Sequence, residues 1–71
     1  MSAAEMGDAH LTDRERQVLQ LLAEGQQTEE IARRLEIGLE TVRTHLRHAS
    51  ARLGATNRTH AVALAIRRKL I

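Results

Sequence analysis

Three glycines, Gly25, Gly38 and Gly54, divide the chain into segments whose apolar residues recur with the period of an α-helix. The first segment opens with a T-x-x-E capping box, in which Thr12 and Glu15 each accept a hydrogen bond from the other's backbone amide. We expect a helix of about a dozen residues here, ended by Gly25 in the left-handed conformation. With no Pro and only four Gly in 71 residues, the composition favours a compact helical domain.

The second and third segments have the shape of a helix-turn-helix. The stretch "QQTEEIARRLEIG" predicts a helix of about two turns behind a Thr28 N-cap, ending near Leu35 or Glu36. A tight turn containing Gly38 follows, and then a longer helix from about Leu39 to Leu53. A short helix, a tight turn and a longer helix are typical of this motif.

The fourth segment, residues 58–71, predicts another helix after a short connection. Four of its residues are expected to enter the core: Ala61, Val62, Ala65 and Ile66. A chain this short forms one domain at most. We therefore predict an all-α, four-helix domain with a central helix-turn-helix over residues 11–71. Residues 1–10 lack periodicity and are predicted to be a disordered tail or the stub of a linker.

The charges of the chain are strongly polarised. Residues 1–40 carry four Arg and nine acidic residues, a net charge of −5, whereas residues 41–71 carry seven basic residues and no acidic one, a net charge of +7. A chain polarised in this way usually presents its positive half to phosphates or to an acidic partner. The second half of the chain is therefore the place to look for a binding surface.

The helix expected over residues 39–53 has two contrasting faces. Its narrow apolar stripe consists of Val42, Leu46, Ala49 and Leu53. The opposite face has long hydrogen-bond donors and small residues but no bulky hydrophobe: Glu40, Arg43, Thr44, Arg47 and Ala51. A helix of this width fits the major groove of DNA, where Arg bonds to guanine and Thr offers a hydroxyl or a methyl group. Because the chain has no Phe, Tyr or Trp on which to stack bases, duplex DNA is favoured over single strands.

Other kinds of site find less support in the sequence. His45 and His48 project within about 60° of each other on a helix, but the chain has no Cys, and no carboxylate follows Glu40 to complete a metal site. We expect no metal, no cofactor and no enzymatic activity, since no catalytic constellation stands out. No apolar run reaches the length of a membrane span and no signal peptide is evident, so we expect a cytoplasmic protein without membrane contact.

Three stretches carry a resemblance to a known family: "LTDRERQVLQLLAEG", "EEIARRLEIGLETVRTHLRHASARLGA" and "NRTHAVALA". Over about residues 10 to 70 the chain resembles the LuxR/FixJ/NarL-type DNA-binding domain, the C-terminal effector of many bacterial transcription factors and response regulators. The resemblance implies four helices, of which the second and third form the helix-turn-helix. It further implies that the third helix enters the major groove and that the fourth mediates dimerisation.

Carried over residue by residue, the resemblance assigns roles to individual side chains. The base-reading positions fall on Arg43, Thr44 and Arg47. The positions that contact the DNA backbone fall on Thr28, Thr41, His48 and Arg52. For dimerisation we expect small outward residues of the fourth helix beside two leucines: Thr59, Ala63, Leu64 and Leu70.

The chain also departs from the family pattern at the expected DNA surface. Glu29 stands where the family often has Lys, and Gly38 stands where it often has Ser or Thr, so two phosphate contacts are expected to be lost. Gln27 replaces a frequent Ser, which is why Thr28 is the expected N-cap. Glu40 lies on the DNA-facing side, where it either pairs with Arg43 or accepts a hydrogen bond from a cytosine amine.

Three functions are compatible with these features. The favoured one is sequence-specific binding of duplex DNA by a bacterial transcription regulator, acting as a homodimer at least on DNA. The alternative is a protein-interaction module that docks an acidic partner, such as a subunit of RNA polymerase, without a specific DNA site. Nonspecific binding of the nucleoid type is the third.

Overall fold

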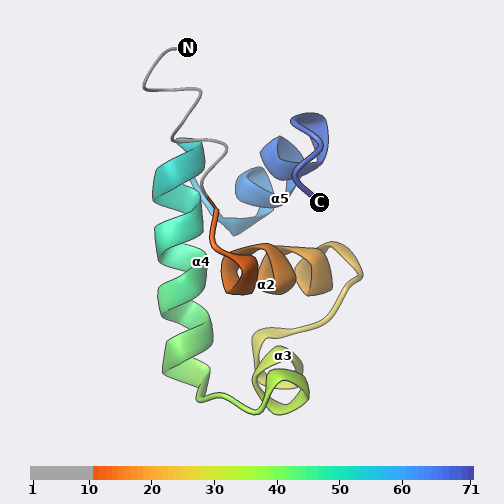
Figure 1. The fold of residues 1–71 in the computed structure, drawn as a ribbon, viewed down its shortest axis with the longest axis vertical. Helices are drawn as coiled ribbons and strands as arrows, with labels where there is room; N and C mark the ends of the chain where they lie inside the picture. Colours follow the sequence, from red (N-terminus) through yellow and green to blue (C-terminus); the bar gives the residue numbers. More distant parts are fainter. Residues whose placement is uncertain (1–10) are drawn as a thin grey trace.

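The computed structural model describes residues 11–71, and the predicted tail at residues 1–10 lies outside the described part. Within residues 11–71 the chain forms four helices and no strand, as expected: α2 (Asp13–Ala23), α3 (Thr28–Leu35), α4 (Leu39–Leu53) and α5 (Arg58–Arg67). The long helix α4 forms one side of the molecule, and α2 crosses it (Figure 1). Helices α3 and α5 pack on opposite sides of α2, and both contact α4 (Figure 1).

The hydrophobic core lies where the four helices meet. Val18 and Leu19 of α2, Ile31 of α3 and Val42 of α4 are all fully buried. The apolar stripe predicted on α4 is confirmed, since Val42, Leu46, Ala49 and Leu53 are all buried. Helix α5 contributes only alanines to the fully buried set, Ala61 and Ala65, so its backbone can approach α2 and α4 closely. Burying α4 along one stripe leaves its other face to solvent.

The capping box at the start of α2 forms as predicted. The Glu15 amide donates to the Thr12 hydroxyl at 3.0 Å, and the Thr12 amide donates to Glu15 Oε1 at 3.1 Å. The Glu15 carboxylate also has a long-range partner, because Arg52 Nε lies 3.4 Å from Oε1. The Glu15 side chain is only 2% exposed, whereas that of Arg52 is 41% exposed. This ion pair joins the beginning of α2 to the last turn of α4.

The start of α3 differs from the sequence-based expectation. The N-cap of α3 is Gln27, not Thr28, because the Gln27 carbonyl accepts the first helical hydrogen bond, from the Ile31 amide at 3.0 Å. In the turn between α3 and α4, which the sequence did not describe residue by residue, Glu36 has a positive φ of 58°. Gly38 has φ of −72° and serves as the N-cap of α4.

Replacing Glu36 with glycine is expected to stabilise the domain. A non-glycine residue in the left-handed region is strained, and glycine relieves that strain at the expense of a more flexible unfolded chain. We expect the free energy of unfolding to rise by about 0.5–1 kcal/mol in urea titrations followed by circular dichroism. The matched control is Glu24→Gly, at a C-cap with φ of −84°, which should lower stability. A loss of stability in Glu36→Gly would mean that the Glu36 side chain contributes more than its backbone strain costs.

Helix α5 is shorter than predicted and its buried face is different. Asn57 caps its start by accepting a hydrogen bond from the His60 amide at 2.9 Å. The helix ends at Arg67, and the Leu70 amide donates to the Ala65 carbonyl at 2.8 Å, which folds the last residues back against the core. Ile66 was expected in the core but is 53% exposed. It lies about 100° around the helix from Ala65, and the returning chain end packs on the core instead.

Candidate nucleic-acid interface

The three residues predicted to read bases lie together on the outward face of α4. Arg43 and Arg47 are exposed, and Thr44 between them is half-buried. The buried Val42, Leu46 and Ala49 belong to the stripe of α4 that packs into the core. Because the core fixes the rotation of α4 about its axis, the two arginines point to solvent away from α2.

Two hydrogen bonds within α4 hold these arginines in place. Arg43 Nη1 donates to Glu40 Oε2 at 2.6 Å, so Glu40 takes the first of the two roles left open for it. Arg47 Nη2 donates to Thr44 Oγ1 at 3.3 Å. The Glu40 side chain is 80% exposed, and the Arg43 side chain is 47% exposed. An exposed pair of this kind contributes about 0–1 kcal/mol, so it orders Arg43 without preventing its exchange to another acceptor.

A third arginine, which the sequence did not single out, joins the same surface. Arg43, Leu46, Arg47 and Ser50 of α4 and Arg58 of α5 line an open hollow of about 360 Å³, with no acidic residue among them. Arg58 is the first residue of α5, directly after its N-cap. The free amides of a helix N-terminus and an arginine both favour an anion such as a phosphate. Only the packing of α5 on α4 reveals that Arg58 belongs here.

The predicted backbone-contacting residues have different surroundings. Thr41 and His48 are exposed on α4. Thr28 is 8% exposed and its hydroxyl donates to Glu29 Oε1 at 3.2 Å. Arg52 is paired with Glu15, as described above. Contact of all four with DNA stays a prediction, but Thr28 and Arg52 already have partners within the domain.

Glu29 places a negative charge at the N-terminus of α3. Hydrogen bonds from its own backbone amide and from the Thr28 hydroxyl lower the pKa of the Glu29 carboxyl below its ordinary value. The carboxylate is therefore ionised at neutral pH, and its contribution to stability is lost only as the pH falls through that lowered pKa. A charge of this sign repels phosphates, which supports the expected loss of the contact that Lys makes in the family.

The histidines do not gather into a metal site in the described part. His60 Nδ1 accepts a hydrogen bond from the Thr56 amide at 3.0 Å, beside the cap of α5, and His48 is exposed on α4. Within residues 11–71 no three His, Cys, Asp or Glu side chains are grouped so as to hold a metal ion. In the same range no helix is both long enough and apolar enough to span a membrane.

The residues expected to mediate dimerisation differ in their exposure. Thr59 is exposed and Ala63 is half-buried, whereas Leu64 and Leu70 pack partly against the core. The exposed Ile66 follows Thr59 and Ala63 at the spacing i, i+4 and i+7, so these three residues share one side of α5. The sequence pattern predicts Ile66 in the core because it directly follows a core alanine, so its exposure becomes apparent only in the structure.

The sequence of residues 9–65 matches the family of bacterial regulatory proteins, luxR family. Over 61 residues the chain is 51% identical to the transcriptional activator protein BjaR1 of Bradyrhizobium diazoefficiens. The aligned region covers 86% of this chain but only 25% of BjaR1. The chain is also 46% identical over 52 residues to the spore germination protein GerE of Bacillus subtilis. This aligned region covers 73% of this chain and 70% of GerE.

A solved structure has the same fold. The crystal structure of the response regulator ChrA, from a heme-sensing two-component system, superposes with a TM-score of 0.83 at 40% sequence identity. The match covers 87% of this chain and 31% of the ChrA chain. The similarity is therefore to one part of ChrA, as it is to one part of BjaR1.

Proposed function

Because the chain belongs to the luxR family of bacterial regulatory proteins, we propose that residues 11–71 bind duplex DNA sequence-specifically as the DNA-binding part of a transcription regulator. The observation that carries this proposal is the outward face of α4, where Arg43, Thr44 and Arg47 stand opposite a fully packed apolar stripe. The name of BjaR1, a transcriptional activator, is consistent with that role. Selection of binding sites from a random duplex library tests it directly.

In the proposed complex α4 lies in the major groove. Its 15 residues give a helix about 22 Å long, and the groove is about 12 Å wide, enough to admit one helix. Arg43 and Arg47 supply paired donors to guanine, and Thr44 contacts a base edge or a thymine methyl group. Arg43 exchanges its contact with Glu40 for one with a base or retains both, since a guanidinium has five N–H groups.

Affinity in this proposal comes mainly from the phosphates. Arg58, the first residue of α5, lines the hollow beside Arg43 and Arg47, so we assign Arg58 to a backbone phosphate. Thr41 and His48, exposed on α4, are further candidates for backbone contacts. Phosphate contacts fix the position of the helix and make binding depend on salt, while base contacts select the sequence.

Replacing Arg58 with alanine is expected to weaken binding on every duplex alike. A lost phosphate contact should reduce affinity about threefold to tenfold and lower the slope of log affinity against log salt by about one. Fluorescence anisotropy with end-labelled duplexes at several salt concentrations measures both quantities. The control is Arg67→Ala, which removes an exposed arginine at the other end of α5. A change in sequence preference would instead make Arg58 a base contact.

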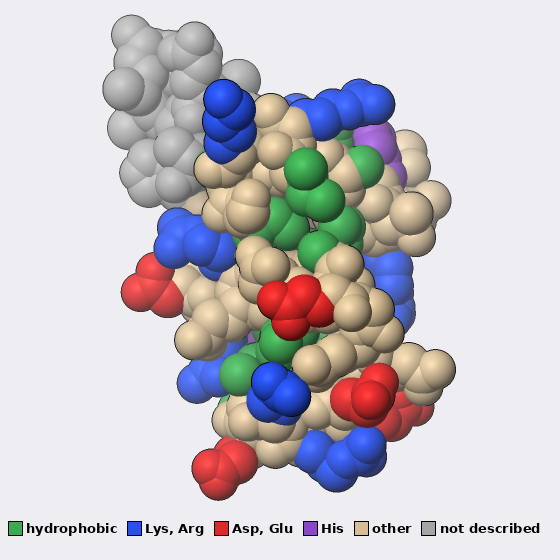
Figure 2. All heavy atoms as spheres, turned by 90° about the vertical axis from the view of Figure 1, so that its right-hand side faces the viewer, with side chains coloured by type: hydrophobic (Ala, Val, Ile, Leu, Met, Phe, Trp, Pro, Cys, Tyr) green, Lys and Arg blue, Asp and Glu red, His purple; other side chains and the backbone are tan. Residues whose placement is uncertain are grey.

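We also propose that two copies pair through α5 when they bind DNA. Thr59, Ala63 and Ile66 form a side of α5 with small residues and one exposed isoleucine. Figure 2 shows hydrophobic side chains gathered in the upper half of the face it presents, on the side where α5 lies in Figure 1. The lower half of that face, over α3, carries charges of both signs. An apolar patch is the better surface for a second copy of the chain.

Ile66→Glu is expected to abolish cooperative binding of two copies to a duplex with two half-sites. Pairing would bury two like charges at the interface, whereas the affinity for an isolated half-site should stay within about twofold because Ile66 does not line the hollow shared by Arg43, Arg47 and Arg58. Gel-shift titrations on duplexes with one and two half-sites separate these effects. The control is Ala23→Glu, which places the same charge on the exposed end of α2. Unchanged cooperativity in Ile66→Glu would argue against pairing through this side of α5.

The proposed role also sets the expected location and partners. A bacterial regulator acts on the chromosome, so we place the protein in the cytoplasm. RNA polymerase is the expected protein partner of such a regulator at a promoter. The mechanism requires no cofactor and no chemical step.

A further inference from the structure

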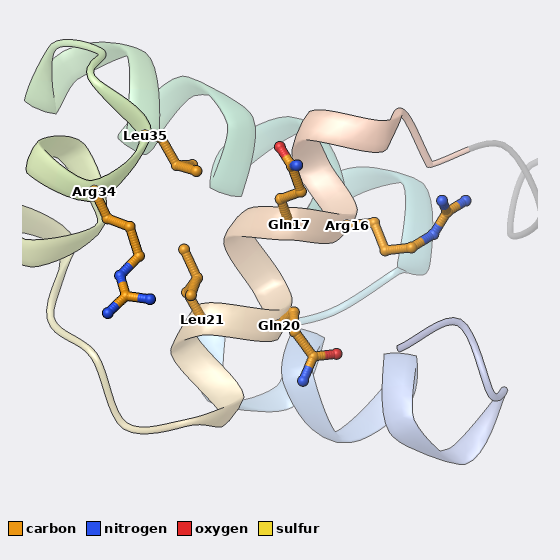
Figure 3. A pocket seen from close by; sticks show the side chains of 6 residues that line it. All are labelled: Arg16, Gln17, Gln20, Leu21, Arg34 and Leu35. Carbon is orange, nitrogen blue, oxygen red and sulfur yellow. The ribbon is translucent and has the colours of Figure 1, made fainter.

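A second hollow lies between α2 and α3, away from the arginine face of α4. Its volume is about 310 Å³, and it is lined by Arg16, Gln17, Gln20 and Leu21 of α2 and by Arg34 and Leu35 of α3. In Figure 3 the Leu21 and Leu35 side chains extend into the gap between the two helices, and Arg34 extends alongside Leu21. The floor of this groove is therefore apolar and its rim is polar.

The size and openness of the groove suit side chains of a protein partner better than a small molecule. Pockets for small ligands range from about 300 to 1,000 Å³ and enclose most of the ligand, so this groove is at the lower limit and is open along the two helices. Leu21 and Leu35 are only partly buried, although each also packs against the core. An amphipathic helix can place aliphatic side chains in such a groove at i and i+4.

The charge of the rim selects the kind of helix. None of the six lining residues is acidic. Arg34 forms no ion pair with any described residue. Arg16 Nη1 lies 3.2 Å from Asp13 Oδ1, but that carboxylate is 96% exposed, so the pair is weak and can exchange. Two guanidinium groups and two amides beside an apolar floor complement carboxylates that flank an aliphatic residue.

The groove shares no lining residue with the hollow of the predicted reading face. No residue of α4 lines it, and Arg43 and Arg47 project from the side of α4 opposite to the stripe that packs on the other helices. We propose that the α2–α3 groove docks an acidic amphipathic helix of a partner protein. An aliphatic side chain of that helix enters between Leu21 and Leu35, and a carboxylate pairs with Arg34. This docking is independent of how α4 reads DNA.

The test uses a displayed library of helical peptides, randomised on one face, with the 71-residue chain as bait. Enriched peptides are expected to carry aliphatic residues at i and i+4 flanked by Asp or Glu. Arg34→Glu should weaken their binding about tenfold or more. The matched control is Arg33→Glu, an equally charged change at an exposed neighbour on α3 that does not line the groove. Both variants alter exposed side chains, and circular dichroism checks that they fold.

A nuclear magnetic resonance titration locates the bound peptide. Shifts centred on the amides of Leu21 and Leu35 are expected, in both the presence and the absence of DNA. Acidic peptides could also bind the basic surface of α4, so shifts confined to α4 and α5 would overturn the proposal. It is likewise overturned if no peptide is enriched, if the enriched peptides lack acidic residues, or if they bind Arg34→Glu as well as the unmodified chain.

Discussion

Arg47→Ala is expected to relax base discrimination at one position of each half-site by about 1–3 kcal/mol, up to roughly a hundredfold in the ratio of affinities. Arg47 projects from the outward face of α4, one turn after Arg43, and its one described hydrogen bond is to the Thr44 hydroxyl. A hydrogen bond to a neutral hydroxyl is readily exchanged for a paired contact with guanine. Affinities for duplexes that differ at single base pairs measure the effect.

Arg47→Lys is the informative companion variant. Lys retains the charge but lacks the planar pair of donors, so it should retain most of the affinity for nonspecific DNA and lose discrimination. Arg67→Ala, at the distant end of α5, should leave both quantities unchanged. If Arg47→Ala weakens binding equally on all sequences, Arg47 contacts the backbone and the base-reading role belongs elsewhere on α4.

Arg52→Ala is expected to lower the free energy of unfolding by about 2 kcal/mol. It removes the ionic partner of the Glu15 carboxylate, which is 2% exposed and would then retain, among the described residues, the Thr12 amide of the capping box. Breaking a fully buried ion pair costs about 3–5 kcal/mol. The cost expected here lies below that range because Arg52 is 41% exposed and water reaches the pair. In a domain of this size the melting temperature should fall by roughly 10 °C.

Glu15→Gln separates the two possible roles of Arg52. The amide oxygen of Gln can still accept the hydrogen bond from Thr12, and no buried charge is left behind, so Glu15→Gln should largely rescue the stability of Arg52→Ala. If Arg52 acts only on a DNA phosphate, the outcome is different. The Arg52→Ala variant would then fold as stably as the unmodified chain. Its slope of log DNA affinity against log salt would be lower by about one, as expected for the loss of one phosphate contact.

The features that sequence predicted well are local. The capping box of Thr12 and Glu15 and the positive φ of Gly25 depend on neighbouring residues, and both are confirmed. The bounds of α4 also match, because a helical apolar stripe between Gly38 and Gly54 leaves little freedom in where it begins and ends. The same periodicity predicted that Arg43, Thr44 and Arg47 would share a face.

The features that sequence missed depend on packing between distant segments. The pair of Glu15 and Arg52 joins the first turn of α2 to the last turn of α4, which are far apart in the sequence. Arg58 approaches the reading face only because α5 packs on α4 through small alanines. Ile66 is exposed, and Leu70 and Ile71 pack against the core where the chain turns back after Arg67. None of these three features can be predicted from the residues next to it in the sequence, because each depends on contacts with a distant segment.

The central claim is that the face of α4 selects a DNA sequence, and binding-site selection from a random duplex library at about 150 mM salt tests it most directly. The DNA must carry the label, because the chain has no Phe, Tyr or Trp. We expect enrichment of a short motif, repeated with a dyad or tandem spacing near one helical turn, and we expect Arg47→Ala to enrich a version degenerate at one position. Salt-sensitive binding without an enriched motif, or the same motif from Arg47→Ala, would contradict the account.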